Sequence, residues 1–154
     1  MTALPQQHLG PEQIANLSSK YIDSGLKQER WRIKSIDVDG AHLRAELCMD
    51  STFVSPTDPG GFHLTIFATQ EFLAQLSNIY LHLLAGSTVK NRETWMRESA
   101  ITARSAIRDR NKILVEMHFF SVRRVRNTVY AKANCKVFDE AGGSFTAKLA
   151  GIMS

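Results

Sequence analysis

The chain has 154 residues, of which 44% are hydrophobic, and it carries a formal net charge of +4. This length and composition predict one domain, residues 1–154, that is able to bury a core. The mild basic excess suits phosphate groups or an acidic protein surface, and we expect no nucleic-acid partner.

Targeting signals are not recognisable in the sequence. Residues 1–10 lack a basic stretch followed by an apolar run, so we expect no signal peptide and a cytoplasmic location. The most apolar window, residues 72–85, carries Gln75, Asn78 and His82 and is too short to span a membrane. Cys48 and Cys135 both fall in alternating patterns, which predicts reduced, buried thiols rather than a disulfide or a zinc site.

The N-terminal residues 1–30 are expected to form a helical extension. Pro11 suits the first turn of a helix, the apolar residues that follow have helical spacing, and Gly25 is a plausible stop. From Trp31 the pattern changes to strand, and two alternating segments flank the turn signal Asp39-Gly40, which predicts a hairpin.

A Pro/Gly-rich loop at residues 55–61 then leads to a segment with helical periodicity, residues 62–85, which ends before Gly86. Its apolar residues spread around most of the helix circumference, including Phe67 and Phe72, which predicts a long helix buried on most sides. Residues 87–100 are mostly polar and predict a surface connection or a short amphipathic helix.

The second half of the chain is predominantly strand-like. We predict strands near residues 101–108, 112–121, 124–138 and 144–153, the last two forming a hairpin through residues 139–143. One buried helix and a long series of antiparallel strands, without crossover helices, predict an α+β fold and disfavour a parallel α/β sheet.

Four polar residues of the long helix fall on one narrow arc, because their spacings are four, three and four: Glu71, Gln75, Asn78 and His82. Two interpretations are open. The stripe is a solvated or dimer-facing edge, or it is a site in which desolvation raises the pKa of Glu71 and makes it a general base or acid, while Gln75 and Asn78 hold a substrate carbonyl or a water.

Residues before the helix offer a second candidate group. His63 lies near the expected helix start, where unpaired N–H groups suit an oxyanion, and the glycines Gly60 and Gly61 permit a ligand to come close. A solvated histidine and a simple turn are the alternatives.

Basic residues gather in two stretches, at 104–112 and 123–126, and either bind phosphate or are solvated strand ends. Nucleophile-elbow, P-loop, dinucleotide-binding and metal-ligand motifs are absent, so we predict no cofactor and no metal.

Three segments together resemble the hotdog-fold thioesterases and dehydratases. They are the approach Pro59-Gly-Gly-Phe-His63 to a long helix containing Glu71-Phe-Leu-Ala-Gln75, the stretch 107–116, and the closing stretch 138–149. Within that superfamily the chain is most similar to the FcoT-type fatty acyl-CoA thioesterases. The resemblance implies one helix wrapped by a curved antiparallel sheet, and a homodimer or a dimer of dimers.

The resemblance also implies a function and its residues. It favours hydrolysis of an acyl thioester, on coenzyme A or an acyl carrier protein, at the N-terminal half of the helix and the dimer interface. Glu71, His63, Gln75 and Asn78 are the catalytic candidates. Tyr21, Gly60, Gly61 and Thr65 are the substrate-binding candidates. Dehydration of a 3-hydroxyacyl thioester by His63 and Glu71, and binding of acyl-CoA without turnover, remain alternatives.

Overall fold

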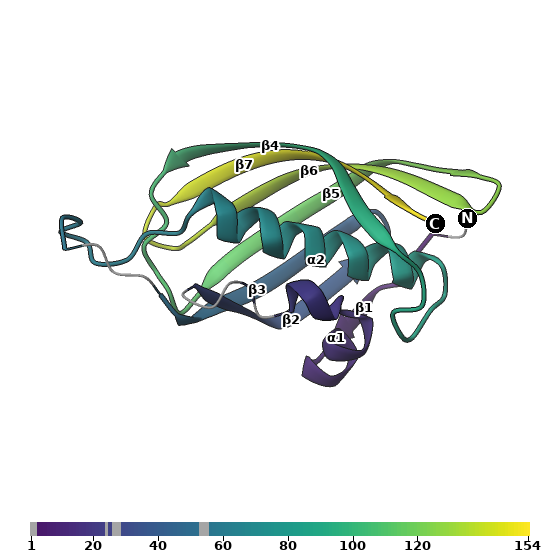
Figure 1. Ribbon diagram of the computed structural model, residues 1–154, viewed down its shortest axis with the longest axis horizontal. Coiled ribbons are helices and arrows are strands. Elements are labelled where there is room, and N and C mark those ends of the chain that lie inside the picture. The colour runs from purple at the N-terminus through teal and green to yellow at the C-terminus, as the bar shows by residue number, and fades with distance from the viewer. Residues whose placement is uncertain (1–2, 24, 26–28, 53–55) are drawn as a thin grey trace.

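The computed structural model describes residues 3–23, 25, 29–52 and 56–154. One long helix lies against a curved sheet of seven strands (Figure 1). The strands are β1 (Gln7–Leu9), β2 (Arg30–Asp39), β3 (His42–Ser51), β4 (Thr94–Ser105), β5 (Ile113–Val125), β6 (Thr128–Phe138) and β7 (Ser144–Met153). The helices are α1 (Pro11–Leu17), the short 3₁₀ helix η1 (Lys20–Ile22) and the central α2 (Ile66–Leu84).

The strand order across the sheet is β1-β2-β3-β5-β6-β7-β4, and every pair of neighbours is antiparallel. Helix α2 connects β3 to β4, which lies at the far edge beside β7. The chain then returns to place β5 beside β3. One edge of the sheet is therefore the three-residue β1, and the other is the twelve-residue β4.

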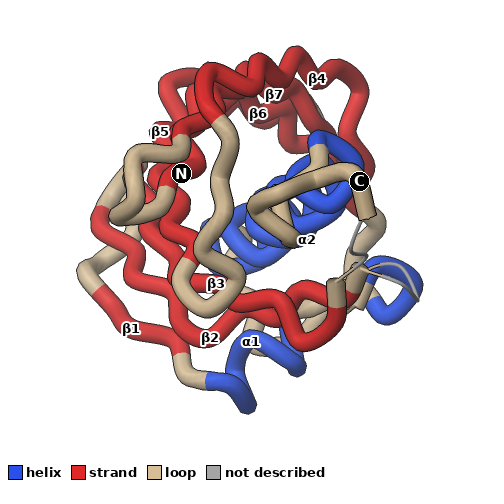
Figure 2. Tube along the Cα trace, turned by 90° about the vertical axis from the view of Figure 1, so that its left-hand side faces the viewer, coloured by secondary structure: helices blue, strands red, loops and turns tan. Residues whose placement is uncertain are grey.

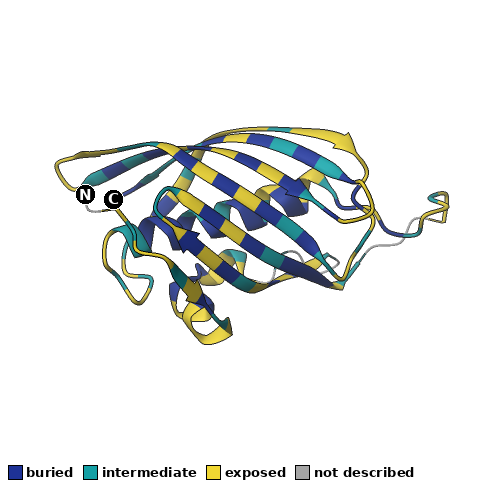
Figure 3. Cartoon of the chain, turned by 180° about the vertical axis from the view of Figure 1, so that it is seen from behind, coloured by how far each residue is buried: buried dark blue, intermediate teal, exposed yellow. Residues whose placement is uncertain are grey.

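The core lies between α2 and the concave face of the sheet, which curls around the helix (Figure 2). Strand residues alternate between buried and exposed, as the back of the sheet shows in Figure 3. This period of two follows from strand geometry, because successive side chains point to opposite faces. On α2, Phe72, Leu73, Leu76 and Ile79 have no exposed surface, and this close burial fixes the helix against the sheet.

The predicted fold class is confirmed. The segment near residues 62–85 contains the longest helix, and the sheet is antiparallel throughout. Both hairpins that alternation predicted are present, with turns at Asp39-Gly40 and at residues 139–143. Cys48 and Cys135 are free and buried, as expected, and burial raises the pKa of Cys135 to about 12.

The start of the central helix was predicted four residues too early. The helix begins at Ile66, because the Thr65 side chain accepts a hydrogen bond from the Ala68 backbone N–H and caps the first turn. Phe62 and Leu64 are buried but lie in the preceding loop, where the Leu64 N–H donates to the Ile107 carbonyl. Phe67, expected in the core, is 75% exposed.

The interpretation of residues 87–100 as a connection or amphipathic helix is wrong from residue 94 onward. Strand β4 begins at Thr94 and pairs with β7 along its length, with bulges at Met96/Glu98 and Ala103/Ser105. It is an edge strand, and most of its residues are exposed on both faces, so the alternation of buried and exposed residues used to predict strands is missing. Strand β5 likewise continues to Val125, beyond the predicted end at residue 121.

The N-terminal extension is only partly helical. Residues Gln7–Leu9 form β1 on the sheet, and α1 ends at Leu17, well before Gly25, the expected stop. The sequence predictions for residues 1–30 and for the loop at 55–61 include residues 1, 2, 24, 26–28 and 55, which lie outside the described residues.

Candidate active site

An elongated groove of about 530 Å³ runs along α2. One wall is a face of the helix, one is formed by the start of β4 and the end of β7, and η1 contributes the rim. Its lining residues are Tyr21, Ile22, Phe67, Gln70, Glu71, Ala74, Ser77, Asn78, Leu81, Thr94, Trp95, Met96 and 149–152. The helix residues recur at spacings of three and four, so they form one face of α2.

Glu71 is the only charged residue among the described residues that line the groove. Its side chain is half-buried and lies on the N-terminal half of α2. Phe67 and Ala74 of the same lining lie about one helical turn away from it on either side. A carboxylate is therefore placed within an otherwise uncharged groove.

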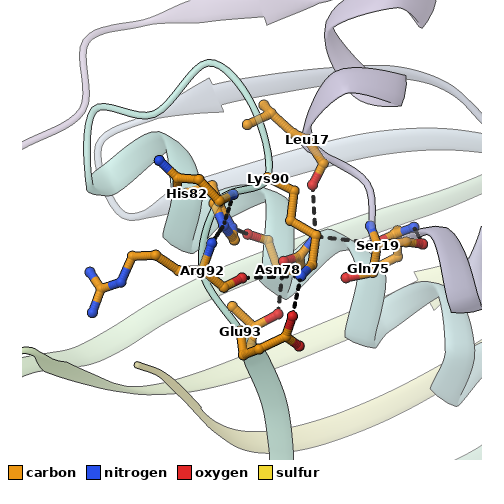
Figure 4. A network of polar contacts seen from close by, with 10 residues as sticks. Leu17, Ser19, Gln75, Asn78, His82, Lys90, Arg92 and Glu93 are labelled. Atoms are coloured by element: carbon orange, nitrogen blue, oxygen red, sulfur yellow. Dashed lines mark hydrogen bonds and ion pairs between the residues drawn. The ribbon is translucent and has the colours of Figure 1, made fainter.

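Gln75 and Asn78 belong to a buried network between α2 and the N-terminal segment (Figure 4). The Gln75 carbonyl oxygen accepts from the Ser19 N–H at 2.9 Å, and its amide nitrogen donates to the Ser19 carbonyl at 3.2 Å. The Asn78 amide nitrogen donates to the Leu17 carbonyl at 2.8 Å and to Gln75 at 3.2 Å, while its oxygen accepts from the Thr94 hydroxyl at 2.7 Å. The polar atoms of both amides are thus used within the chain.

His82 extends the same network to the segment before β4. Its Nδ1 donates to the Asn78 carbonyl at 2.9 Å, and its Nε2 accepts from the backbone N–H groups of Asn91 and Arg92 (Figure 4). These contacts require the neutral imidazole. Burial lowers the pKa of His82, and the nearby charges of Lys90 and Arg92 oppose its protonation as well. His82 is a structural residue in this arrangement.

The sequence interpretation of the stripe as a solvated or dimer-facing edge is therefore wrong for three of its four members. Gln75, Asn78 and His82 are at most 1% exposed and are covered by the same chain. A dimer through this stripe is excluded for the same reason. Asn78 still contributes to the groove lining, and Glu71, the fourth member, is half-buried in that lining.

His63 lies in the loop before α2 and not in the groove lining. Its Nδ1 is 2.6 Å from an Asp58 carboxylate oxygen, and the other Asp58 oxygen accepts from Arg108 Nη1 at 2.9 Å. These contacts, together with the Gly60 N–H, lower the pKa of Asp58 to about 2. A Cβ at Gly60 would overlap the Arg108 guanidinium, so this glycine is explained by packing within the loop.

The other substrate-binding candidates are divided between two places. Tyr21 lies at the groove rim with 72% of its surface exposed. Gly60, Gly61 and Thr65 do not line the groove; Gly61 has a φ of 78°, and Thr65 caps α2 while donating to the Glu29 carboxylate at 3.1 Å.

Sequence reasoning did not identify the strand side of the groove. Trp95 and Met96 of β4 were the only large apolar residues of a segment interpreted as a connection, and Gly151 of β7 was treated only as a strand residue. On the helix side, Phe67, Ala74 and Leu81 recur every seven residues. This spacing places the three residues on one face of the helix, and the small Ala74 between two larger side chains was the sequence feature that could have indicated a groove.

Asp139 is another buried carboxylate with a structural explanation. It accepts hydrogen bonds from the backbone N–H groups of Arg108, Asp109, Ala141 and Gly143, at 2.7–3.1 Å. Burial opposes its ionisation, but these four donors stabilise the carboxylate and the net effect lowers the pKa of Asp139. It joins the β6–β7 turn to the loop before β5.

Among the described residues, no group of three or more His, Cys, Asp or Glu side chains is placed to hold a metal ion. No helix within the described part of the chain is long and apolar enough to cross a membrane.

Comparison with solved structures identifies the fold. The chain is similar to the dehydratase heterocomplex ApeI:P from Xenorhabdus doucetiae (TM-score 0.56, 10% identity, covering 90% of this chain and 88% of that one). It is also similar to a hypothetical thioesterase from Streptococcus pneumoniae solved with coenzyme A (TM-score 0.53, 10% identity, 81% and 86% covered). A conserved protein from Pseudomonas aeruginosa matches as well (TM-score 0.52, 12% identity, 95% and 100% covered).

These structures and this chain share the hotdog fold, which confirms the resemblance inferred from sequence at the level of the fold. No family model matches the sequence, and no curated protein does. The narrower likeness to the FcoT-type thioesterases stays a prediction.

Proposed function

We propose that this protein hydrolyses acyl thioesters in the groove beside α2. The observation that carries the proposal is a long, largely apolar groove with one carboxylate, Glu71, in its lining. An acyl chain fits such a groove because burying its methylene groups is favourable, by about 0.8 kcal/mol for each. The carrier of the acyl group is proposed to be coenzyme A or an acyl carrier protein.

In the proposed reaction Glu71 acts as the general base. Its carboxylate takes a proton from a water, and the resulting hydroxide attacks the thioester carbonyl carbon. The tetrahedral intermediate collapses by breaking the C–S bond, and Glu71 returns the proton to the leaving thiolate, so that the products are a carboxylic acid and a thiol. The first turn of α2, where Phe67 lines the groove, presents the positive end of the helix dipole to the oxyanion.

Gln75 and Asn78 are proposed to be positioning residues. Gln75 holds Ser19, which directly precedes η1, the short helix that contains Tyr21. Asn78 holds Thr94, the first residue of β4. Because η1 and β4 form two sides of the groove, these two amides set its width. The polar atoms of both amides have partners within the chain, so their proposed role is to position other residues and not to hold the water.

The proposed active form is a homodimer that pairs through β4. This strand has a partner on one side only, β7, and it is twelve residues long, whereas the opposite edge strand has three residues. A long unpaired edge is normally covered in a stable protein. Phe67 and Trp95 are exposed and both line the groove, which β4 helps to form, so a second copy paired along β4 would also cover part of the groove.

The dehydratase alternative requires His63 and Glu71 at one site. Within this chain, Glu71 lines the groove, whereas His63 is bonded to Asp58 in the loop and is absent from the described lining. One chain alone therefore does not bring the two residues together, and dehydration would require His63 and Glu71 to come from different subunits.

A panel of acyl-CoA thioesters, assayed for thiol release, tests the proposal. We expect release that depends on acyl length, and a loss of tenfold or more when Ala74→Phe fills the middle of the groove. Binding of acyl-CoA without thiol release would favour the alternative of a binding protein. Formation of a 2,3-unsaturated acyl-CoA from 3-hydroxyacyl-CoA, without release of the thiol, would favour the dehydratase.

A further inference from the structure

Positive charge is concentrated in two segments that lie together, 90–98 and 121–132. They contain seven of the 19 Lys and Arg residues and two of the 15 Asp and Glu residues. The rest of the chain therefore carries no net positive charge. Arg92 joins the two segments by donating to the backbone carbonyl of Asn127.

Part of this cationic region is a hollow of about 220 Å³ on the face of the sheet that points away from α2. Strand register places two rows of residues across it. One row is Arg123, Tyr130, Ile152 and Trp95, and the other is Ser121, Lys132, Ala150 and Glu98, each from β5, β6, β7 and β4 in turn. Tyr130 and Lys132 face outward, because their neighbours Val129 and Ala131 are buried.

The β4 bulge between Met96 and Glu98 lies at this hollow and brings Arg97 into its lining. Bulges commonly redirect a side chain in this way. The floor is formed by the small residues Ala150 and Gly151, which leave space above the sheet.

Three cations in the lining have no counter-charge of their own. Among the described residues, Arg97, Arg123 and Lys132 form no ion pair and no side-chain hydrogen bond. Elsewhere on the sheet, Arg32 pairs with Asp50 and Lys34 with Glu46. The hollow therefore has unused donors and an excess of positive charge over its single carboxylate, Glu98.

We propose that this hollow binds a nucleoside phosphate. Arginine and lysine supply charge-assisted hydrogen bonds to phosphate oxygens, and the fork of an arginine matches two of them. Tyr130 offers an aromatic surface on which a base stacks, and Glu98 accepts a hydrogen bond from a ribose hydroxyl. The source of the nucleotide is either the nucleotide end of coenzyme A or a free nucleotide.

Titration with adenosine 3′,5′-bisphosphate, with adenosine and inorganic phosphate as separate probes, tests the binding directly. We expect the bisphosphate to bind more tightly than either probe. The double variant R123A/K132A should weaken its binding by roughly 10- to 100-fold, since each lost contact is a hydrogen bond to a charged group. The matched control is K136A/K148A, which removes two lysines from the same sheet face outside the hollow and should change binding by less than a factor of about two.

This inference does not depend on the proposed function, because the titration needs no turnover. No bisphosphate binding at millimolar concentration, or equal losses in both double variants, would overturn it.

Kinetics then identify the source of the nucleotide. If it is the end of coenzyme A, R123A/K132A raises KM for an acyl-CoA and leaves the matching acyl-pantetheine, which lacks the nucleotide, unchanged. If it is a free nucleotide, the variant turns over both substrates like the parent, and added nucleotide changes the rate of the parent alone. Equal losses on both substrates would place the effect in the groove and contradict the proposal.

Discussion

Two neighbouring faces of α2 differ in how their polar residues are used. On one face, Gln75, Asn78 and His82 are buried, and each contacts a segment distant in sequence. On the other face, Glu71 and Phe67 border an open groove. The comparison shows that one polar stripe on a buried helix can have two roles. Where other segments of the chain bond its side chains, the stripe is structural, and where it borders a groove, it is a candidate site.

Removing the central amide of the covered face should have the largest effect on stability. Asn78→Leu leaves the Leu17 carbonyl and the Thr94 hydroxyl without their partner in a buried place, and we expect a loss of about 2–4 kcal/mol in the free energy of unfolding. Chemical denaturation measures this loss.

The control for that substitution is the adjacent residue. The Ser77 hydroxyl donates only to the Leu73 carbonyl of its own helix, so Ser77→Ala should change stability by less than about 0.5 kcal/mol. Equal effects of the two substitutions would show that the buried network does not hold this face.

The pH dependence of stability should report on His82. The folded protein keeps His82 neutral with a lowered pKa, whereas the unfolded chain has a pKa near 6.5. Below about pH 6.5 the unfolded state binds a proton that the folded state does not, so stability falls as the pH decreases toward the folded pKa. Denaturation midpoints between pH 7.5 and 5 measure this slope.

His82→Gln should flatten that slope, because it removes the group whose pKa is lowered in the folded state. The depressed pKa values of Asp58 and Asp139 act only below about pH 4 and do not contribute in this window. If the slope persists in His82→Gln, another titratable group causes it.

The smallest effect on stability is expected on the groove face. Phe67→Ser removes a side chain that is 75% exposed, so the free energy of unfolding should change by less than about 0.5 kcal/mol. Because Phe67 lines the groove, KM for long acyl thioesters should still rise several-fold. A loss of stability without a change in KM would place Phe67 in the core instead.

The sequence predicted most of the fold because alternation is strong where one sheet face is buried, as in β3 and β6. It failed at residues 94–100, the first part of β4, because an edge strand that is exposed on both faces has no buried face to impose the pattern. The hydrophobic spacing of α2 also predicted a buried helix, but the cap at Thr65, which sets its start, is a local hydrogen bond that hydrophobicity does not report.

The site was predicted only in part for a related reason. The stripe from Glu71 to His82 was visible in the spacing, but its partners Leu17, Ser19 and Thr94 are fixed by tertiary structure. Similarly, the contact of His63 with Asp58 depends on the loop conformation. Residue spacing identifies which side chains share a face, and it does not identify what covers that face.

The most direct test of the central claim compares two carboxylates. Glu71 lines the groove, and Glu116 lies exposed on the outer face of β5. We predict that Glu71→Gln lowers kcat/KM for acyl-thioester hydrolysis by about 10²- to 10⁴-fold, the usual contribution of a positioned general base, while the fold is kept. Glu116→Gln should have the activity of the parent. Hydrolysis by Glu71→Gln within a factor of about three of the parent would contradict the account.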